Sequence, residues 1–493
     1  MDVTRDNFAH ALREFRAAVA ACDFAAMDME MTGLYEDRAR QPSRDDSLDQ
    51  RYAKLKQSVE SYAVTQVGIC LFTWVGDGPA GYYEARPFNF NVFPCSSVGA
   101  VPVETHFGCK NTAFEFLARN SFDFNKWIYH GVPYLSLADA ERIRAERTSL
   151  LTKPQPRIHV DDNHRAYVSE VEDALRRFVH AKGRTTMHCE TANSYQRKLV
   201  YDMVARYKTL GTRSRIGGIE VFKGTRKAMA QHVAYKIKAL TASIDDARGF
   251  AHVIDLLSAA RKPVVGHNML LDVMHAYAKF HCPLPASRAA FARCMARFLP
   301  VLIDTKYIIE STPAIKARYR TSNLDEIGPM LEREASPPPH PLIRNHPLFT
   351  RDVSHTMHEA GFDAYMTGAT FIRLLNLEGE LDLTAAAAAA SAHSSELVLY
   401  RYINRLYVAL GDDLYWSLST STANSEDARS VAAIAVPATN DSDSLEDDDD
   451  DDAAACCSSY SDDDCSSDNV QPSKNASPPL PPAAGLAALR LSN

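Results

Sequence analysis

Four acidic residues and one histidine are the side chains of this sequence best suited to catalyse a hydrolysis. Asp28 and Glu30 lie in FAAMDMEMTGL, Asp272 in VVGHNMLLDV, and His358 and Asp363 in HEAGFDAYMTG. Strand side chains alternate between two faces, so the D-x-E spacing puts both carboxylates on one face of a strand. Because apolar residues precede Asp28, we expect both acids at the end of a core strand, where two buried carboxylates require a cation.

Each position also has an ordinary structural explanation when it is considered alone. A D-x-E pair can be the solvent-facing end of a strand, an acid near a helix start is favoured by the helix dipole, and a histidine near an aspartate can be a simple hydrogen-bonded pair. Taken together, four hard oxygen ligands without an accompanying cysteine favour Mg²⁺ or Mn²⁺ over zinc. Two such ions can stabilise the attacking and leaving oxygens of a phosphodiester displacement, and a histidine can accept the proton of the attacking water.

The apolar patterns around these residues predict a sheet flanked by helices. Strands are expected at 24–29, 66–75, 82–90, 263–266 and 301–304, with a helix at 269–279 and a last strand pair at 404–419. Asp272 lies one turn into the helix at 269–279 among Met, Leu and Val residues, so we expect it to face a cleft. Asp363 is expected at the start of a further helix, with His358 in the loop or at the helix edge before it.

A separate pattern predicts a small inserted α+β domain at residues 161–246. Helices are expected at 167–180 and 194–208, and strands at 185–190 and 216–222. This set of elements is self-contained, so it would interrupt a larger domain, which comprises residues 1–160 and 247–420.

Charge and composition separate a folded body from an acidic tail. The net charge of the chain is -8, but residues 421–493 hold 15 Asp and Glu against three Lys and Arg, which leaves the body at +4. The Ser-, Asp-, Ala- and Pro-rich tail cannot bury enough apolar surface to fold alone, so it is predicted to be disordered, with an unknown partner. A mildly basic body is compatible with a polyanionic partner, but this charge is too small to predict one.

The cysteines and the hydropathy of the chain indicate a soluble intracellular protein. Ten cysteines occur without a CxxC pair, which is typical of a reducing compartment. The amino terminus lacks the apolar core of a signal peptide, and no run of 18 uncharged apolar residues occurs. We therefore expect no membrane association.

The motif order D-x-E, N-x-x-x-D and H-x-x-x-x-D resembles that of the DEDD exonucleases with a catalytic histidine. Five longer blocks resemble the poly(A)-specific ribonuclease family within this group, in the family's order. These blocks are FAAMDMEMTGL (24–34), SFDFNKWIYHGVPYL (121–135), VVGHNMLLDVMHAYAKFHCPLP (264–285), LIDTKYI (302–308) and HEAGFDAYMTGATF (358–371).

This resemblance implies both a fold and an activity. The fold would be an RNase H-like α/β domain, a mixed sheet flanked by helices, with an inserted nucleic-acid-binding domain and a disordered acidic tail. Asp28, Glu30, Asp272 and Asp363 would hold two Mg²⁺ ions, or Mn²⁺, with Asp28 bridging both, and His358 would orient or deprotonate the water. The protein would be a homodimer in the nucleus and cytoplasm that shortens 3′ poly(A) tails of single-stranded mRNA from the 3′ end and releases 5′-AMP.

Four positions of the nuclease segments match family positions that contact RNA. Lys306 matches a contact to the RNA, with a surface lysine at a helix start as the alternative. Met31, Leu34 and Phe114 match apolar positions that wedge against the terminal bases, with core packing as the alternative.

Asp304, at the end of a strand, is expected to have a structural role near the site.

The inserted segment resembles the single-strand-binding domain named for its Arg-x-x-x-His motif. Arg197 stands in the arginine position of NSYQRKLVYDMVARYK (193–208), whereas Tyr201 replaces the histidine. Residues four apart share a face of a helix, so Arg197 could bind a phosphate beside a stacking Tyr201. Simple helix packing is the alternative.

Two other functions fit the same residues. The same chemistry could trim the 3′ ends of small noncoding RNAs. The chain could instead be an inactive RNA-binding adaptor on an exonuclease scaffold, although an adaptor has no physical need for four clustered acids.

Overall fold

The structure is a computed structural model. It describes residues 1–76, 81–99, 101–153, 157–334, 342–349, 358–377, 401–410 and 413–418. Residues 421–493, predicted to be a disordered acidic tail, lie outside the described residues.

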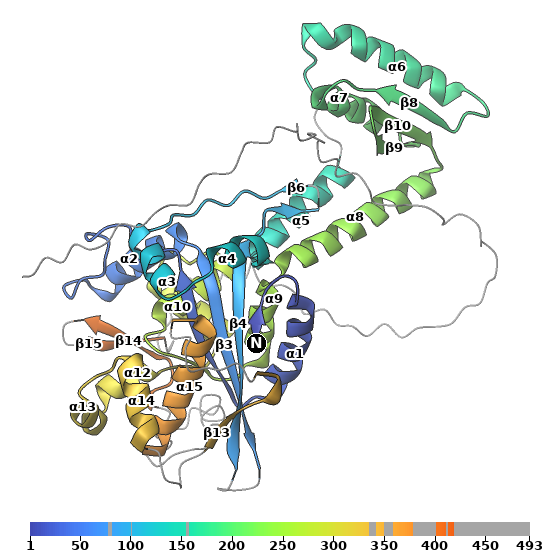
Figure 1. The fold of residues 1–493 in the computed structure, drawn as a ribbon. Helices are drawn as coiled ribbons and strands as arrows, with labels where there is room; N and C mark the ends of the chain where they lie inside the picture. The colour runs from blue at the N-terminus through green and yellow to red at the C-terminus, as the bar shows by residue number, and fades with distance from the viewer. Residues whose placement is uncertain are drawn as a thin grey trace, which may run out of the picture. The chain divides into compact units, whose positions relative to one another are not determined.

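A mixed eight-stranded sheet is the scaffold of the nuclease segments (Figure 1). Its main path runs β1-β4-β3-β2-β11-β12, and β7 and β13 also pair with β4. Strands β2, β3 and β4 are antiparallel, whereas β2, β11 and β12 are parallel. The strands are β1 (Asp2–Val3), β2 (Phe24–Met31), β3 (Val64–Val75), β4 (Tyr82–Pro94), β7 (Val132–Tyr134), β11 (Val264–Gly266), β12 (Leu302–Asp304) and β13 (Leu342–Asn345).

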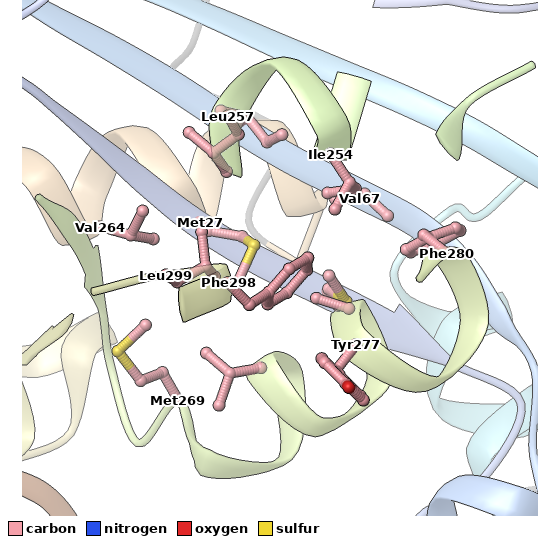
Figure 2. Packing of buried hydrophobic residues seen from close by; sticks show 14 of the residues in the cluster. Met27, Val67, Ile254, Leu257, Val264, Met269, Tyr277, Phe280, Phe298 and Leu299 are labelled. Atoms are coloured by element: carbon pink, nitrogen blue, oxygen red, sulfur yellow. The ribbon is translucent and has the colours of Figure 1, made fainter. Parts of the chain in front are cut away.

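One face of this sheet is covered by the larger apolar core. The odd-numbered residues of β2, from Ala25 to Met31, point into it. Figure 2 shows Met27 of β2 and Val264 of β11 packed with side chains of two covering helices, including Leu257 and Tyr277. The helices that contribute to this core are α1 (Phe8–Ala21), α2 (Leu48–Ser61), α9 (Ala251–Ala260), α10 (Leu270–Phe280) and α11 (Arg288–Phe298).

The opposite face is covered by a second core that includes the even-numbered residues Phe24 and Ala26 of β2. The ring of Phe24 stacks on Phe72 at 4.7 Å and meets Phe371 edge-on at 5.3 Å. The helices on this side are α12 (Thr305–Ser311), α13 (Pro313–Tyr319), α14 (Leu324–Glu334) and α15 (Ala360–Leu377). A mixed sheet with helices on both faces confirms the predicted α/β fold class.

The remaining described elements of the nuclease segments are short or peripheral. The hairpin β14 (Arg405–Leu410) and β15 (Asp413–Ser417) forms a separate two-stranded sheet, as predicted for 404–419. The others are β5 (Ser97–Val98), β6 (Val101–Pro102), α3 (Asn111–Arg119), α4 (Phe124–His130), α5 (Leu137–Thr152) and the 3₁₀ turn η3 (Pro347–Phe349).

Residues 158–223 form a small unit around their own core, which includes Leu175, Leu199 and Val221. Its antiparallel sheet has the order β8-β10-β9. The elements are η2 (Asp162–His164), α6 (Arg165–His180), β8 (Thr186–Glu190), α7 (Ser194–Ala205), β9 (Leu210–Arg215) and β10 (Gly218–Lys223), followed by the long helix α8 (Arg226–Arg248). The boundaries 161–246 and nucleic-acid binding by this unit stay predictions.

The strand predicted at 216–222 is present as β10, but the strand that precedes it was not predicted. The structure has two strands there, β9 and β10, joined by a turn at Gly217, whose φ of 73° is readily adopted by glycine. The sequence LGTRSR of β9 has no alternation of apolar residues, so hydrophobic periodicity could not identify it.

Candidate active site

Strand β2 places Asp28 and Glu30 on the sheet face that is covered by α15. Phe24 and Ala26 occupy this face in the core, and the two acids continue the same row toward the end of the strand. Asp363 lies in the first turn of α15. One carboxylate oxygen from each of Asp28, Glu30 and Asp363 lies within 4.8 Å of the other two. The structure therefore brings together acids that are more than 300 residues apart.

The start of α15 can lie close to the acids because the residue beneath it in the sheet, Gly68, has no side chain. Gly68 pairs with Asp28 across the strands, and a Cβ atom added to Gly68 would lie 1.7 Å from the carbonyl oxygen of Ala360. On the next strand, the Oδ1 atom of Asn89 accepts a hydrogen bond of 3.1 Å from the backbone N–H of Gly361. Gly68 and Asn89 thus set the position of Asp363, and a lone glycine within an apolar strand was a signal of such close approach.

Asp272 approaches β2 from the other sheet face. Strand β11 pairs with β2 only at Ala25 and Ala26, so β2 extends beyond it. The first turn of α10 follows there, and the buried Asp272 accepts a hydrogen bond from the backbone of Met29. Asp272 is therefore enclosed at the expected helix position, next to the strand that carries Asp28 and Glu30.

Asp304 fixes the helices on both sides of the site. It is fully buried, and its carboxylate accepts hydrogen bonds from the backbone N–H groups of Asn268 (2.9 Å) and Met269 (3.2 Å) at the start of α10. It also caps α12 by accepting from Lys306 (3.0 Å), and it accepts from Tyr407 of β14 (3.0 Å). This geometry fits the structural role that the sequence predicted for it.

The four site carboxylates oppose one another electrostatically. Burial, followed by the charges of Asp272, Asp363 and Glu30, raises the pKa of Asp28 well above its usual range. Burial and the charges of Asp363 and Asp272 raise the pKa of Glu30 to about 8. Burial raises the pKa values of Asp272 and Asp363 to about 7, with further contributions from Asp304 and Asp325 respectively.

The donor set fits a hard divalent cation. Within the described residues, no lysine, arginine or histidine forms an ion pair with any of the four carboxylates, so this part of the chain supplies no counterion for their charges. Carboxylate oxygens are the ligands that Mg²⁺ and Mn²⁺ prefer. A bound divalent cation would relieve the repulsion that raises these pKa values.

His358 lies two residues before α15 with a φ of 63°, an uncommon conformation for a residue with a side chain. The Phe116 ring meets its imidazole edge-on at a centroid distance of 4.9 Å. Its Nε2 atom lies 4.0 Å from the Oδ2 atom of Asp325 at the start of α14. The charge of Asp325 also raises the pKa values of Asp28 and Asp363, so this acid belongs to the site. Phe116 and Asp325 were not identified from the sequence, where each resembles an ordinary helix residue.

The predicted RNA contacts of the nuclease segments differ in exposure. Met31 is buried in the larger core, whereas Leu34 is 48% exposed just beyond β2. The ring of Phe114 packs against Phe124 at a centroid distance of 5.0 Å. Lys306 lies in the first turn of α12 near the corner between β11 and α10, where burial and the Lys306 charge lower the pKa of His267 to about 4. Contact of these residues with RNA stays a prediction.

In the inserted unit, Arg197 binds the protein's own backbone. Its guanidinium donates hydrogen bonds to the carbonyl oxygen of Gly218 at 3.1 Å and to that of Arg215 at 3.4 Å, and it also binds Ser214. Tyr201, one turn along α7, is 39% exposed. Arg197 thus ties α7 to the β9–β10 turn, and an RNA phosphate would have to share it.

A family model described as CAF1 family ribonuclease matches residues 3–371. The chain belongs to this ribonuclease family. A similar relative is the poly(A)-specific ribonuclease PARN of Homo sapiens, which is 28% identical over 445 residues that cover 84% of this chain and 69% of the relative. The resemblance to poly(A)-specific ribonucleases is therefore confirmed.

Two further proteins are similar to this member of the CAF1 family. The pre-piRNA 3′-exonuclease trimmer of Bombyx mori is 26% identical over 386 residues, covering 76% of this chain and 71% of the relative. A structure of S. pombe Pop2p in its Mg²⁺- and Mn²⁺-bound form is 15% identical with a TM-score of 0.39, covering 77% of this chain and 94% of that one. Within the described residues, no helix is long and apolar enough to cross a membrane.

Proposed function

We propose that this protein is a 3′-to-5′ exoribonuclease of the DEDD type with a catalytic histidine, and that it shortens poly(A) tails with release of 5′-AMP. The observation that carries the proposal is the convergence of the Asp28, Glu30 and Asp363 carboxylates within 4.8 Å in a chain of the CAF1 ribonuclease family. Asp272 completes the set from the opposite sheet face. Such a site suits hydrolysis of a phosphodiester at a free 3′ end.

The four carboxylates would hold two Mg²⁺ ions, with Mn²⁺ as a substitute. When bound, the ions would polarise the phosphodiester and make water a better nucleophile at neutral pH. The chain contributes a rigid arrangement of ligands, because Asp28 and Glu30 lie on a central strand and the helices of Asp272 and Asp363 are tied down by Asp304 and Asn89. Ligands on rigid elements hold their geometry better than ligands on loops.

His358 accepts the proton of the attacking water in the proposed reaction. Its side chain is 29% exposed, so it can reach solvent and substrate. The edge-on ring of Phe116 restricts the rotation of the imidazole. A general base gains from such restriction because proton transfer needs a fixed heavy-atom geometry.

Single-stranded RNA would be bound by an apolar contact and by backbone charge. The exposed Leu34 lies three residues beyond the end of β2. Lys306 supplies a positive charge near the α10 corner, where it can contact a backbone phosphate. The inserted unit at 161–246 would act as a second RNA-binding domain, with the exposed Tyr201 as a stacking platform beside Arg197.

The test uses 5′-labelled RNA that ends in a run of adenosines or in a run of uridines. Wild type and Asp28→Ala are compared with Mg²⁺ and with EDTA, and Glu170→Gln at an exposed position of α6 is the matched control. Stepwise shortening of the adenosine tail alone, abolished by EDTA and by Asp28→Ala, is expected. Equal loss of both tails would indicate a general exonuclease, and binding without shortening would indicate an adaptor.

Trimming of small noncoding RNA 3′ ends is a second candidate, because the Bombyx mori trimmer is a relative of this chain. Competition between an adenosine-tailed RNA and a small RNA with a short heterogeneous 3′ extension separates the two. Faster consumption of the extended small RNA at equal concentration would favour trimming.

A homodimer is also expected from the resemblance to poly(A)-specific ribonucleases. Light scattering of the eluting peak in size-exclusion chromatography measures this directly, and a mass twice the 54.6 kDa of one chain is the expected result.

A further inference from the structure

The hairpin β14–β15 lies beyond the residues matched by the family model, which ends at 371. It forms a separate sheet that is nevertheless anchored to the nuclease domain. Asn404 accepts from the backbone N–H of Leu302 at 3.0 Å through its side chain, and its own N–H donates to the Leu302 carbonyl oxygen at 2.8 Å. At the other strand, the buried Trp416 packs against Tyr52 and Phe291 at 5.9 and 5.7 Å. The hairpin is therefore anchored through both strands.

Tyr407 of this hairpin has a fixed position relative to the candidate active site. Its backbone N–H donates to the Oδ2 atom of Asp304 at 3.0 Å. The same carboxylate caps α12 at Lys306 and holds the start of α10, the helix of Asp272. Asp304 thus connects the hairpin, helix α12 with Lys306, and helix α10 with Asp272.

The side chain of Lys306 is held by an aromatic ring. Its Nζ atom lies 5.2 Å from the ring centroid of Tyr407, which is within cation–π distance. Glu310, one turn along α12, forms an ion pair with Lys316 at 2.8 Å. In the described parts of the chain, no carboxylate lies within ion-pair distance of the Lys306 ammonium. An aromatic ring orients a cation without neutralising it, so the charge stays available for an anion.

We propose that Tyr407 is a positioning residue of the RNA site, whose ring holds the Lys306 ammonium in place to bind a phosphate of the RNA backbone. This inference rests on the proposed function, and it makes the hairpin part of the RNA site. Any residue except proline at 407 keeps the hydrogen bond to Asp304, because the backbone N–H donates it. The contribution of the Tyr407 ring to RNA binding can therefore be tested separately from this hydrogen bond.

The experiment measures binding of fluorescein-labelled oligoadenylate to the full chain in EDTA by fluorescence anisotropy, so that no RNA is consumed. Lys306→Ala and Tyr407→Leu are each expected to raise the Kd by about three- to tenfold. Tyr407→Phe keeps the ring and is expected to bind like wild type. The double variant of Lys306→Ala and Tyr407→Leu should bind no more weakly than Lys306→Ala alone, because both substitutions remove the same contact with the RNA.

The matched control is Tyr415→Leu, at the position directly across the hairpin from Tyr407. The Tyr415 ring faces Arg405 at 5.0 Å and packs against Tyr307 of α12 at 4.9 Å, whereas the cation–π contact of Lys306 is with Tyr407. An unchanged Kd for Tyr415→Leu is expected, and an equal loss would overturn the inference in favour of hairpin integrity. Thermal unfolding of each variant, and Tyr407→Met as a second ring-free variant, separate a local effect from misfolding.

The remaining outcomes distinguish the inference from the proposed function. If Tyr407→Leu binds like wild type while Lys306→Ala binds weakly, Tyr407 does not position the lysine. If Lys306→Ala also binds like wild type, the lysine contact itself is wrong. Shortening of adenosine-tailed RNA by Lys306→Ala in Mg²⁺ then shows whether the exoribonuclease activity stands without that contact.

Discussion

Three carboxylates of the candidate active site lie close together, and burial and the charges of nearby acids raise their pKa values. Asp28 and Glu30 lie on one strand face with Asp363 close to both, and the charge of Asp363 raises the pKa values of Asp28 and Glu30. Folding therefore brings together charges that the unfolded chain keeps apart. This arrangement is costly for the metal-free protein and favours divalent cations.

Glu30→Gln is expected to make the metal-free protein less sensitive to alkaline pH. The pKa of Glu30 is raised to about 8 in the folded state, so its contribution to stability is present at low pH and is lost as pH rises through that value. In EDTA at about pH 8, the variant should unfold a few degrees above wild type, with little difference near about pH 5. Differential scanning fluorimetry measures this, and an identical decline of both proteins would contradict it. Glu170→Gln is the control.

Phe116→Leu is expected to reduce turnover without weakening RNA binding. The ring touches His358, and loss of its restriction should lower kcat by about tenfold while KM stays within about twofold of wild type. Steady-state kinetics with adenosine-tailed RNA test this, and Phe116→Tyr should be close to wild type. The double variant with His358→Ala should be no slower than His358→Ala alone. A raised KM with unchanged kcat would instead indicate a contact with a base.

Secondary-structure elements meet at the site because particular positions permit close approach. The row Asp28, Gly68 and Asn89 crosses β2, β3 and β4, and the start of α15 lies directly on it. Gly68 provides room for the helix backbone, and Asn89 binds the N–H of Gly361. The position of Asp363 thus depends on the neighbouring strands as much as on its own helix.

Gly68→Ala is expected to displace the start of α15. The new Cβ would lie 1.7 Å from the Ala360 carbonyl oxygen, which is a backbone atom that cannot move alone. Overpacking of this kind costs about 1–3 kcal/mol, and a misplaced ligand can reduce turnover by about 100-fold. The control is Gly108→Ala, where the nearest atom to the new Cβ would be 3.5 Å away. Thermal unfolding and exonuclease assays that show no difference between the variants would contradict this account.

On the scale of the whole molecule, the candidate active site joins two chain segments that are separated by the inserted unit. Asp28 and Glu30 come from the first segment, and Asp272 and Asp363 come from the second. A cation bound to all four would stabilise the docking of the segments only in the folded state.

Saturating Mg²⁺ is therefore expected to raise the unfolding temperature of wild type. A ligand present at about 100 times its Kd adds about 2.7 kcal/mol to the free energy of unfolding when the unfolded chain does not bind it. Asp28→Ala should lose most of this gain, whereas Glu170→Gln should keep it. Calorimetry with Mg²⁺ and with EDTA measures the difference, and an equal shift for all three proteins would mean that the ion binds elsewhere.

The sequence predicted the elements that bury regular apolar patterns. Strands β2, β3, β4, β11 and β12 and helix α10 occur close to the predicted positions because their apolar residues recur with the period of the element. Helix α2 has no counterpart among the predicted elements, although Tyr52, Leu55 and Val59 recur at helical spacing in it. Strand β9 was missed because its polar residues show no alternation. Strand β9 is held by pairing with β10 and by the turn at Gly217.

The sequence by itself determined which acids and which histidine could act together, because residue types and motif order persist in the linear chain. Only the tertiary structure decided how they are held. Gly68, Asn89, Asp325 and Tyr407 act on residues far away in sequence, and no local pattern relates them to Asp363, His358 or Lys306. Their roles depend on strand register and on which helix ends meet the sheet, and these are properties of long-range packing.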